Sequence, residues 1–384
     1  MDFDLNDEQR LLKDSVERLI ADRYSFEARK TFITEPEGFS RANWSQFAEL
    51  GLLAVPFAEE HGGIGGGPIE TMIVMEAFGR GLVVEPYLAT VILGGGLVRH
   101  AGSEAQKADL LPRIAAGELT LALAQIERGS RYDLHHVETR AKRDGDGWLL
   151  SGEKGVVLHG DTADQLVVVA RTAGATRDRA GVGLFLVDAR APGLSRRGYP
   201  TQDGMRAAEI SLENVRVGQD AVLGDPAAAL PVLERVVDEA IAALCAEAIG
   251  LMEAMRETTV DYLKTRKQFG VTIGAFQSLQ HRAADMVVAS EQARSMTFFA
   301  TMVSGTDDAA ERAKAVSAAK VQIGRSGRFV GQGAIQLHGG VGVTMEYKVG
   351  HYFKRMTVIE TLFGDADHHL ARLAESGSLF ASAA

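Results

Sequence analysis

The stretch Arg266-Lys267-Gln268-Phe269-Gly270 is followed closely by Phe276-Gln277, and this pair opens an amphipathic helical pattern. An arginine, a glutamine and an aromatic ring therefore crowd a tight glycine turn at the end of a helix. A guanidinium forms paired hydrogen bonds with diphosphate oxygens, and a flat ring suits the face of a flavin or an adenine. The stretch predicts a cofactor site rather than a piece of hydrophobic core.

A second glycine-rich element, Gln336-Leu337-His338-Gly339-Gly340-Val341-Gly342, lies further along the chain. Glycines let backbone amides approach phosphate oxygens closely, as they do in many anion sites. Two simpler explanations stay open from the residues alone. The glycines could form only a tight turn between helices, and Arg266 could be a solvated charge at a helix end.

Composition limits the classes of function. The chain has 384 residues, 46% apolar content, 24% charged content and a net charge of -10. This length suits two or three domains, and the negative charge disfavours nucleic acid and anionic membranes as partners. Cys245 has no second cysteine for a disulfide. The adjacent pairs His135-His136 and His368-His369 point apart on a strand or helix, so no metal site is predicted. With no leader and no membrane-spanning run visible, we expect a cytoplasmic protein.

Periodicity divides the chain into three segments. The first is helical, because a set of residues recurs at spacings of three and four, and these are Gln9, Leu11, Leu12, Val16, Leu19 and Ile20. The middle segment has short apolar runs bounded by turns, with a hairpin expected at Asp144-Gly145-Asp146-Gly147. From Pro226 onward helical spacing returns. We expect an N-terminal α-helical domain over residues 1–118, a middle β barrel or sandwich over 119–224 and a C-terminal four-helix bundle over 225–384.

Together with the loop from Val55-Pro56 to Gly66 and the turn Gly152-Glu153-Lys154, these elements resemble the acyl-CoA dehydrogenases from end to end. The resemblance implies an α+β multidomain fold, an FAD cofactor and an acyl-CoA substrate that loses two hydrogens across its α and β carbons. It also implies an electron-transfer flavoprotein as electron acceptor.

Family similarity assigns cofactor roles in the C-terminal domain, with Arg266 on the FAD diphosphate and Phe269 against the cofactor. The residues implied along the adenosine and diphosphate path are Gln277, Gln336, Gly339 and Gly340. In this family such residues chiefly serve the flavin of a neighbouring subunit. A homo- or hetero-oligomer, for instance a dimer of dimers, is therefore implied.

The family's catalytic glutamate is missing at both of its usual places, which fall here on Gly364 and Ala240. Glu247 is the leading substitute, because it lies two helical turns after Ala240 and faces the same way. Its apolar surroundings would make an unpaired carboxylate a stronger proton acceptor. The equal alternative is a buried glutamate paired with an arginine of a neighbouring helix. Asp365 and Asp367 are weaker candidates.

The middle domain departs from the family as well. The hydroxyls that meet the flavin ring are replaced by Ile126 and Tyr132, and the covering tryptophan and its threonine neighbour fall on Val156 and Leu158. Glu127 and Asp133 keep the family type. Because the altered positions serve a subunit's own flavin and the retained ones serve its neighbour's, we infer one half of a heteromeric α2β2 dehydrogenase.

Three hypotheses follow from these departures. The chain could work with Glu247 as its own base, or it could be an accessory subunit that completes a partner's FAD site. It could also be a non-enzymatic acyl-CoA-binding protein, although retention of the diphosphate-binding elements disfavours this. Hydrolase chemistry lacks support, since no GxSxG elbow occurs.

Overall fold

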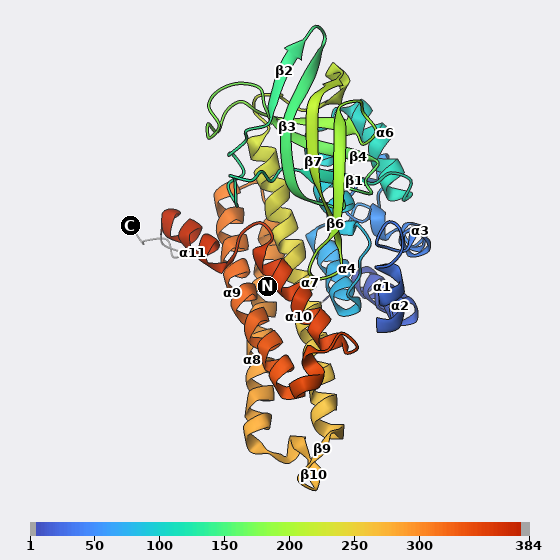
Figure 1. Ribbon diagram of the computed structural model, residues 1–384, viewed down its shortest axis with the longest axis vertical. Helices are drawn as coiled ribbons and strands as arrows, with labels where there is room; N and C mark the ends of the chain where they lie inside the picture. Colours follow the sequence, from blue (N-terminus) through green and yellow to red (C-terminus); the bar gives the residue numbers. More distant parts are fainter. Residues whose placement is uncertain (1–4, 378–384) are drawn as a thin grey trace. The chain divides into compact units, whose positions relative to one another are not determined.

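The computed structural model describes residues 5–377 and divides into two compact units of interleaved sequence (Figure 1). The helical unit comprises Met1–Lys30, Pro68–Val83 and Ile241–Ala384, and the sheet unit comprises Thr31–Gly67 and Val84–Ala240. Within residues 5–377, no helix is long and apolar enough to cross a bilayer.

The helical unit is built from long helices joined by short turns. A small hairpin of two short strands joins α7 to α8, and the long helices α8 and α9 lie side by side (Figure 1). The elements that lie wholly or partly in this unit are α1 (Asp7–Arg23), α2 (Phe26–Phe32), α4 (Pro68–Gly81), α7 (Leu230–Thr265), β9 (Lys267–Gln268), β10 (Val271–Thr272), η5 (Ile273–Ala275), α8 (Gln277–Ser304), α9 (Ala309–His338), η6 (Gly339–Val343), α10 (Lys348–Thr361) and α11 (Ala366–Glu375).

Helix α1 begins at a capping box, in which Asn6 and Gln9 each accept a hydrogen bond from the other's backbone N–H. Val16 and Ile20 are buried as the periodicity predicts, but Leu11 is 67% exposed. The placement of Leu11 on the apolar face is therefore wrong. Leu11 lies five positions before Val16, and at 3.6 residues per turn this offset turns Leu11 away from the core.

Glycines set the close helix crossings of this unit. A Cβ on Gly79 of α4 would lie 2.0 Å from the Glu247 carbonyl oxygen, and one on Gly250 of α7 would lie 2.0 Å from the Glu76 carbonyl oxygen. Backbone thus meets backbone where α4 crosses α7, and a side chain on either glycine would force the helices apart. The crossing fixes α7 at the turn that carries Glu247.

The sheet unit contains a mixed sheet in the strand order β6-β7-β3-β2-β4-β5-β8, with β1 paired in parallel to β4 (Figure 1). Its strands are β1 (Leu121–Ala124), β2 (Arg140–Asp144), β3 (Gly147–Leu158), β4 (Gln165–Arg171), β5 (Val182–Asp188), β6 (Leu194–Pro200), β7 (Arg206–Val217) and β8 (Val222–Leu223). Its helices include α3 (Arg41–Glu49), α5 (Gly95–Ala101), α6 (Glu104–Ala115), η1 (Leu52–Ala54), η2 (Glu59–His61), η3 (Leu88–Gly94) and η4 (Gln219–Ala221). The expected hairpin is confirmed, because Asp144 pairs with Gly147 and Gly145 has a φ of 61°.

Candidate functional site

The predicted cofactor stretch forms a tight hairpin at the end of α7. Strands β9 and β10 pair antiparallel, and the two residues between them, Phe269 and Gly270, have φ values of 54° and 81°. Two successive left-handed residues are what a two-residue hairpin needs, which explains the glycine. The ring of Phe269 is 90% exposed and contacts Phe276 edge to face, with 6.2 Å between centroids. The turn therefore presents an aromatic ring to its surroundings.

Arg266 follows the last turn of α7 and donates its backbone N–H to the Tyr262 carbonyl at 2.8 Å. Its side chain is exposed, and its guanidinium makes no hydrogen bond or ion pair with any residue that the structure describes. Gln277 begins α8 and is exposed too. The cation at the hairpin is thus available to an anion from outside the chain.

The second predicted element forms the end of α9. Gln336 is exposed on the last turn, and Gly339, with a φ of 60°, stops the helix and leads into η6. No atom lies within 4 Å of where a Cβ on Gly339 or Gly340 would stand. The backbone at both glycines is therefore open to a ligand group as large as a phosphate.

An aromatic cluster joins the two elements. The His338 ring lies 4.5 Å from the Tyr262 ring and 5.1 Å from the Tyr347 ring, measured between centroids. Tyr262 stands one turn before Arg266, and His338 directly precedes Gly339, so this contact brings the hairpin and the glycine turn together. Burial lowers the pKa of His338, which keeps its ring uncharged at neutral pH. Sequence reasoning missed this cluster, although its members flank both predicted motifs.

Glu247 lies in α7 and forms a two-pronged ion pair with Arg355 of α10. Nε of Arg355 donates to Oε1 at 2.5 Å, and Nη2 donates to Oε2 at 2.8 Å. The side chains are only 7% and 5% exposed. Both carboxylate oxygens are therefore occupied by one guanidinium, which is the arrangement that the sequence left open as the alternative to a catalytic base.

The turn from Leu362 to Gly364 is held by buried donors. Nζ of Lys320 donates to the Leu362 carbonyl at 2.7 Å and to the Gly364 carbonyl at 2.6 Å. Nε2 of His369 lies 3.1 Å from the Phe363 carbonyl, and its Nδ1 lies 3.1 Å from the hydroxyl of Ser317. Three successive carbonyls of the turn are thus each bound by a buried side chain.

Position 364 itself has no room for a side chain. Gly364 has a φ of 118°, and an added Cβ would lie 2.5 Å from Cδ2 of His368 and 2.7 Å from Nε2 of His369. The neighbouring carboxylate of Asp365 accepts from the His368 backbone N–H at 2.9 Å and caps α11. Asp367 is exposed in the first turn of that helix. The structure therefore gives Asp365 a capping role at this turn.

Three domain families match the chain: the acyl-CoA dehydrogenase N-terminal domain over residues 6–118, the middle domain over 122–215 and the C-terminal domain over 231–377. The acyl-CoA dehydrogenase FadE12 of Mycobacterium tuberculosis is 33% identical over 312 residues, which cover 80% of each protein. The chain belongs to the acyl-CoA dehydrogenase family. Members of this family are FAD-dependent oxidoreductases.

Two solved structures match nearly the whole chain. A variant of the Tcur3481-Tcur3483 steroid ACAD has a TM-score of 0.86 and 31% identity, covering 96% of this chain and 97% of that one. The ChsE4-ChsE5 complex from Mycobacterium tuberculosis has a TM-score of 0.88 and 26% identity, covering 98% of each chain. The predicted acyl-CoA dehydrogenase fold is therefore confirmed.

In the sheet unit of this acyl-CoA dehydrogenase, Glu127 is enclosed by its own chain. Its carboxylate accepts from Nζ of Lys154 at 2.6 Å and from the backbone N–H groups of Glu138 and Thr139 at 2.5 and 2.9 Å. Burial acts to raise the pKa of Glu127, but these donors more than offset it and leave the pKa below its ordinary value. Burial also lowers the pKa of Lys154 to about 8. Glu127 therefore fixes its loop.

Two of the altered positions of the sheet unit, Ile126 and Val156, carry aliphatic side chains. Val156 stands where the family's tryptophan is expected, with a φ of 49° and a 43% exposed side chain. The Ile126 carbonyl accepts from the Gly155 N–H at 2.8 Å. Neither aliphatic side chain can hydrogen-bond to a flavin ring.

The hairpin and the glycine turn fit the chemistry of FAD. A guanidinium with no partner in the described chain and a pair of bare glycines suit a diphosphate, and an exposed aromatic ring suits a flat heterocycle. Arg266, Gly339 and Gly340 would hold the phosphates, and Phe269 would pack on the cofactor.

Proposed function

We propose that this chain is one subunit of a heteromeric, FAD-dependent acyl-CoA dehydrogenase, in which its hairpin and glycine turn complete the FAD site of a different subunit. The observation that carries the proposal is the exposure of the side chains at the hairpin. The Phe269 ring is 90% exposed, which is costly in water unless another molecule covers it, and the nearby guanidinium of Arg266 has no partner among the described residues.

The reaction removes a proton from the α carbon and a hydride from the β carbon of an acyl-CoA thioester. FAD, when bound, supplies the hydride acceptor for this step. Arg266 neutralises diphosphate charge, and the backbone amides at Gly339 and Gly340 donate to phosphate oxygens. Phe269 excludes water from one side of the cofactor. An electron-transfer flavoprotein is the acceptor that the family resemblance implies.

The base for the α proton comes, in this proposal, from the partner subunit. Position 364 carries no side chain, Ala240 has no ionisable group, and both oxygens of Glu247 are engaged by Arg355. A base needs a lone pair directed at the substrate proton, within hydrogen-bond reach. The competing candidate keeps Glu247 as the base of a site in this chain, which requires Arg355 to release it.

The substrate class that we propose is a dicarboxylyl-CoA. The segments Ala284-Asp285-Met286 and Gly364-Asp365-Ala366-Asp367-His368-His369 resemble the small subunit of pimeloyl-CoA dehydrogenase. Two of the similar solved structures carry paired protein names, which supports a heteromeric assembly for this chain as well.

Flavin content tests the proposal directly. The chain purified alone should carry little FAD, and co-expression with a candidate catalytic subunit should yield a yellow complex with FAD at the shared boundary. Arg266→Ala in the complex should weaken FAD binding by about 10- to 100-fold, the amount expected for one charge-assisted contact. One flavin per chain and substrate turnover by the isolated protein would contradict the proposal.

Glu247→Gln separates the two candidates for the base. If Glu247 is a structural partner of Arg355, the variant loses thermal stability, and the complex keeps its turnover once folded. If Glu247 is the base, turnover disappears while flavin absorbance and melting temperature stay unchanged. Turnover of the purified complex, measured together with its melting temperature, distinguishes these results.

A further inference from the structure

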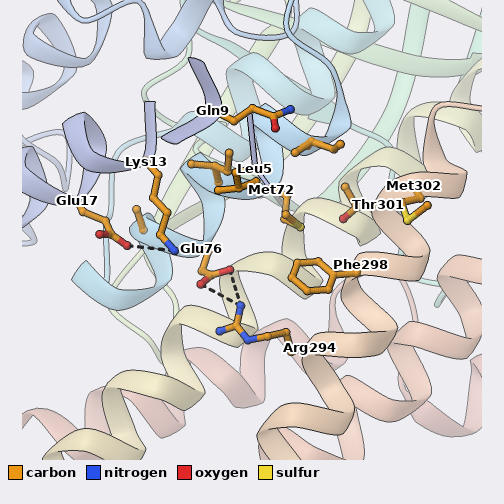
Figure 2. Close-up of a pocket in the computed structure, with 13 residues that line it drawn as sticks. Leu5, Gln9, Lys13, Glu17, Met72, Glu76, Arg294, Phe298, Thr301 and Met302 are labelled. Carbon is orange, nitrogen blue, oxygen red and sulfur yellow. Dashed lines mark hydrogen bonds and ion pairs between the residues drawn. The ribbon is translucent and has the colours of Figure 1, made fainter. Parts of the chain in front are cut away.

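The helical unit contains a trench that none of the cofactor residues line (Figure 2). Its cavity volume is about 250 Å³, and it lies along α4 with α1 and α8 on either side. Its lining residues come from α1 and the residue Leu5 that precedes it, from α4 and from α8: Leu5, Gln9, Lys13 and Glu17; Ile69, Met72, Ile73, Glu76 and Ala77; and Arg294, Phe298, Thr301 and Met302.

Helix α4 forms the floor of the trench, because it packs against both α1 and α8. Met72, Ile73 and Ala77 on this floor are buried, between 3% and 6% exposed. From Ile69 to Ala77 the floor runs for roughly 12 Å at the rise of an α-helix. Phe298 and Met302 of α8 stand over it (Figure 2). One end of the trench is therefore an aliphatic and aromatic slot.

The other end carries two cations and two carboxylates that pair with each other (Figure 2). Both oxygens of Glu76 accept from Nη1 of Arg294, at 3.2 and 3.1 Å. Arg294 also pairs with Glu253 of α7. Nζ of Lys13 lies 3.9 Å from Oε1 of Glu17, so the lysine ammonium has a carboxylate neighbour as well.

These charges decide what the trench can hold. A charged ligand would need an unpaired opposite charge at the rim, and each charge of the lining already has an opposite neighbour. A carboxylate would meet Glu17 and Glu76, and an ammonium would meet Lys13 and Arg294. An uncharged molecule avoids both costs, and its polar end can hydrogen-bond to the ion pairs without displacing them.

We propose that this trench binds an uncharged aliphatic molecule with a single polar head, such as an alcohol or amide of medium chain length. The aliphatic part lies along Met72 and Ile73, and the head group faces Lys13 and Glu76. A dry apolar cavity of about 150 Å³ is enough for benzene, so this larger trench accepts a longer chain. The site belongs to the helical unit and does not rest on the proposed function.

Three probes with the same alkyl chain test this proposal on the full-length protein by calorimetric titration. They are n-octanol, octanoate and octylammonium. We expect n-octanol to bind and to raise the melting temperature with concentration, because it binds only the folded state. Octanoate and octylammonium should bind at least about tenfold more weakly. Absence of n-octanol binding, or equal binding of a charged probe, overturns the proposal.

Two tryptophan substitutions locate the binding. Ile69 is 36% exposed at the trench rim, so Ile69→Trp blocks the trench without overfilling the core. Leu11→Trp places the same side chain on the outer face of α1 as a matched control. We expect Ile69→Trp to weaken n-octanol binding at least about tenfold and Leu11→Trp to leave it unchanged. Unchanged binding in Ile69→Trp would contradict the assignment.

Methyl NMR gives a second measurement, and because it uses the unsubstituted protein, no substitution can disturb the fold. The methyl signals of Met72 and Met302 should shift with n-octanol, while that of the exposed Met345, outside the trench, should not. The same n-octanol titration is repeated on the complex of this chain with its proposed partner subunit, and this experiment tests for a different occupant. If the assembled complex no longer binds n-octanol, a partner side chain fills the trench and the small-molecule proposal is wrong.

Discussion

The hairpin end of the helical unit and the turn at Gly364 differ in whether their polar groups have partners within the chain. At the hairpin, Arg266 and the bare glycines find no partner in the described chain, and Phe269 is 90% exposed. At the turn, Lys320 and His369 are buried and bind successive carbonyls. Unsatisfied groups mark a surface completed by another molecule, whereas satisfied buried groups hold the chain's own shape.

The contrast makes a general prediction about substitutions. Changes in the satisfied interior should cost stability, and changes at the hairpin should cost ligand binding with the fold intact.

Arg355→Met should cost the most, about 3–5 kcal/mol of unfolding free energy, because it leaves the Glu247 carboxylate buried without its partner. Urea denaturation of the purified chain measures this loss. The matched control is Arg179→Met, which breaks the exposed pair of Arg179 with Glu234 and should change stability little. Equal effects of the two substitutions would show that the buried pair is not structural.

Gly364→Ala should cost about 1–3 kcal/mol, because its Cβ meets two histidine rings and its φ of 118° is a conformation that alanine rarely adopts. Gly145→Ala is the control, since Gly145 also has a positive φ but no atom within 4 Å of its Cβ position. A melting temperature for Gly364→Ala that matches the control would mean that the turn has room for a side chain.

His369 should make the fold sensitive to acid. Burial lowers its pKa from 6.5 to about 2, so the unfolded chain takes up a proton that the folded chain excludes. Because folding depresses the pKa of His369, the free energy of unfolding keeps its full value above pH 6.5 and falls as the pH drops toward 2. The slope is about 1.4 kcal/mol per pH unit within that range.

His369→Gln tests this origin of the acid sensitivity. The variant should be less stable at neutral pH and should lose stability less steeply between pH 6 and pH 4, as followed by thermal melts. An unchanged slope in the variant would assign the acid sensitivity to other groups.

Phe269→Ala should have the smallest effect on stability, because the side chain is 90% exposed and has little contact to lose. The melting temperature should stay close to that of the unsubstituted chain. FAD binding by the assembled complex should weaken, and a flavin fluorescence titration measures that change. A large loss of stability with unchanged FAD affinity would reverse the contrast between the two regions.

Local sequence patterns predicted many of the turns and helix ends of this protein. The hairpin residues, the helix ends and the strand turn at Asp144 and Gly147 all depend on neighbours in the chain, and the structure has them where the patterns predict. Leu11 shows the limit of this approach, because spacings of three and four can be fitted to a residue that points away from the core.

The sequence by itself determined the family, the order of helices and strands, and the position of the two motifs that suit a cofactor, since each of these is encoded in short segments. Only the tertiary structure decided that Glu247 pairs with Arg355, 108 residues away, and that His369 and Lys320 bind one turn. Only the tertiary structure showed the trench along α4. Such contacts depend on which helix faces meet, and that is set by packing across the whole unit rather than by the spacing of residues in any one segment.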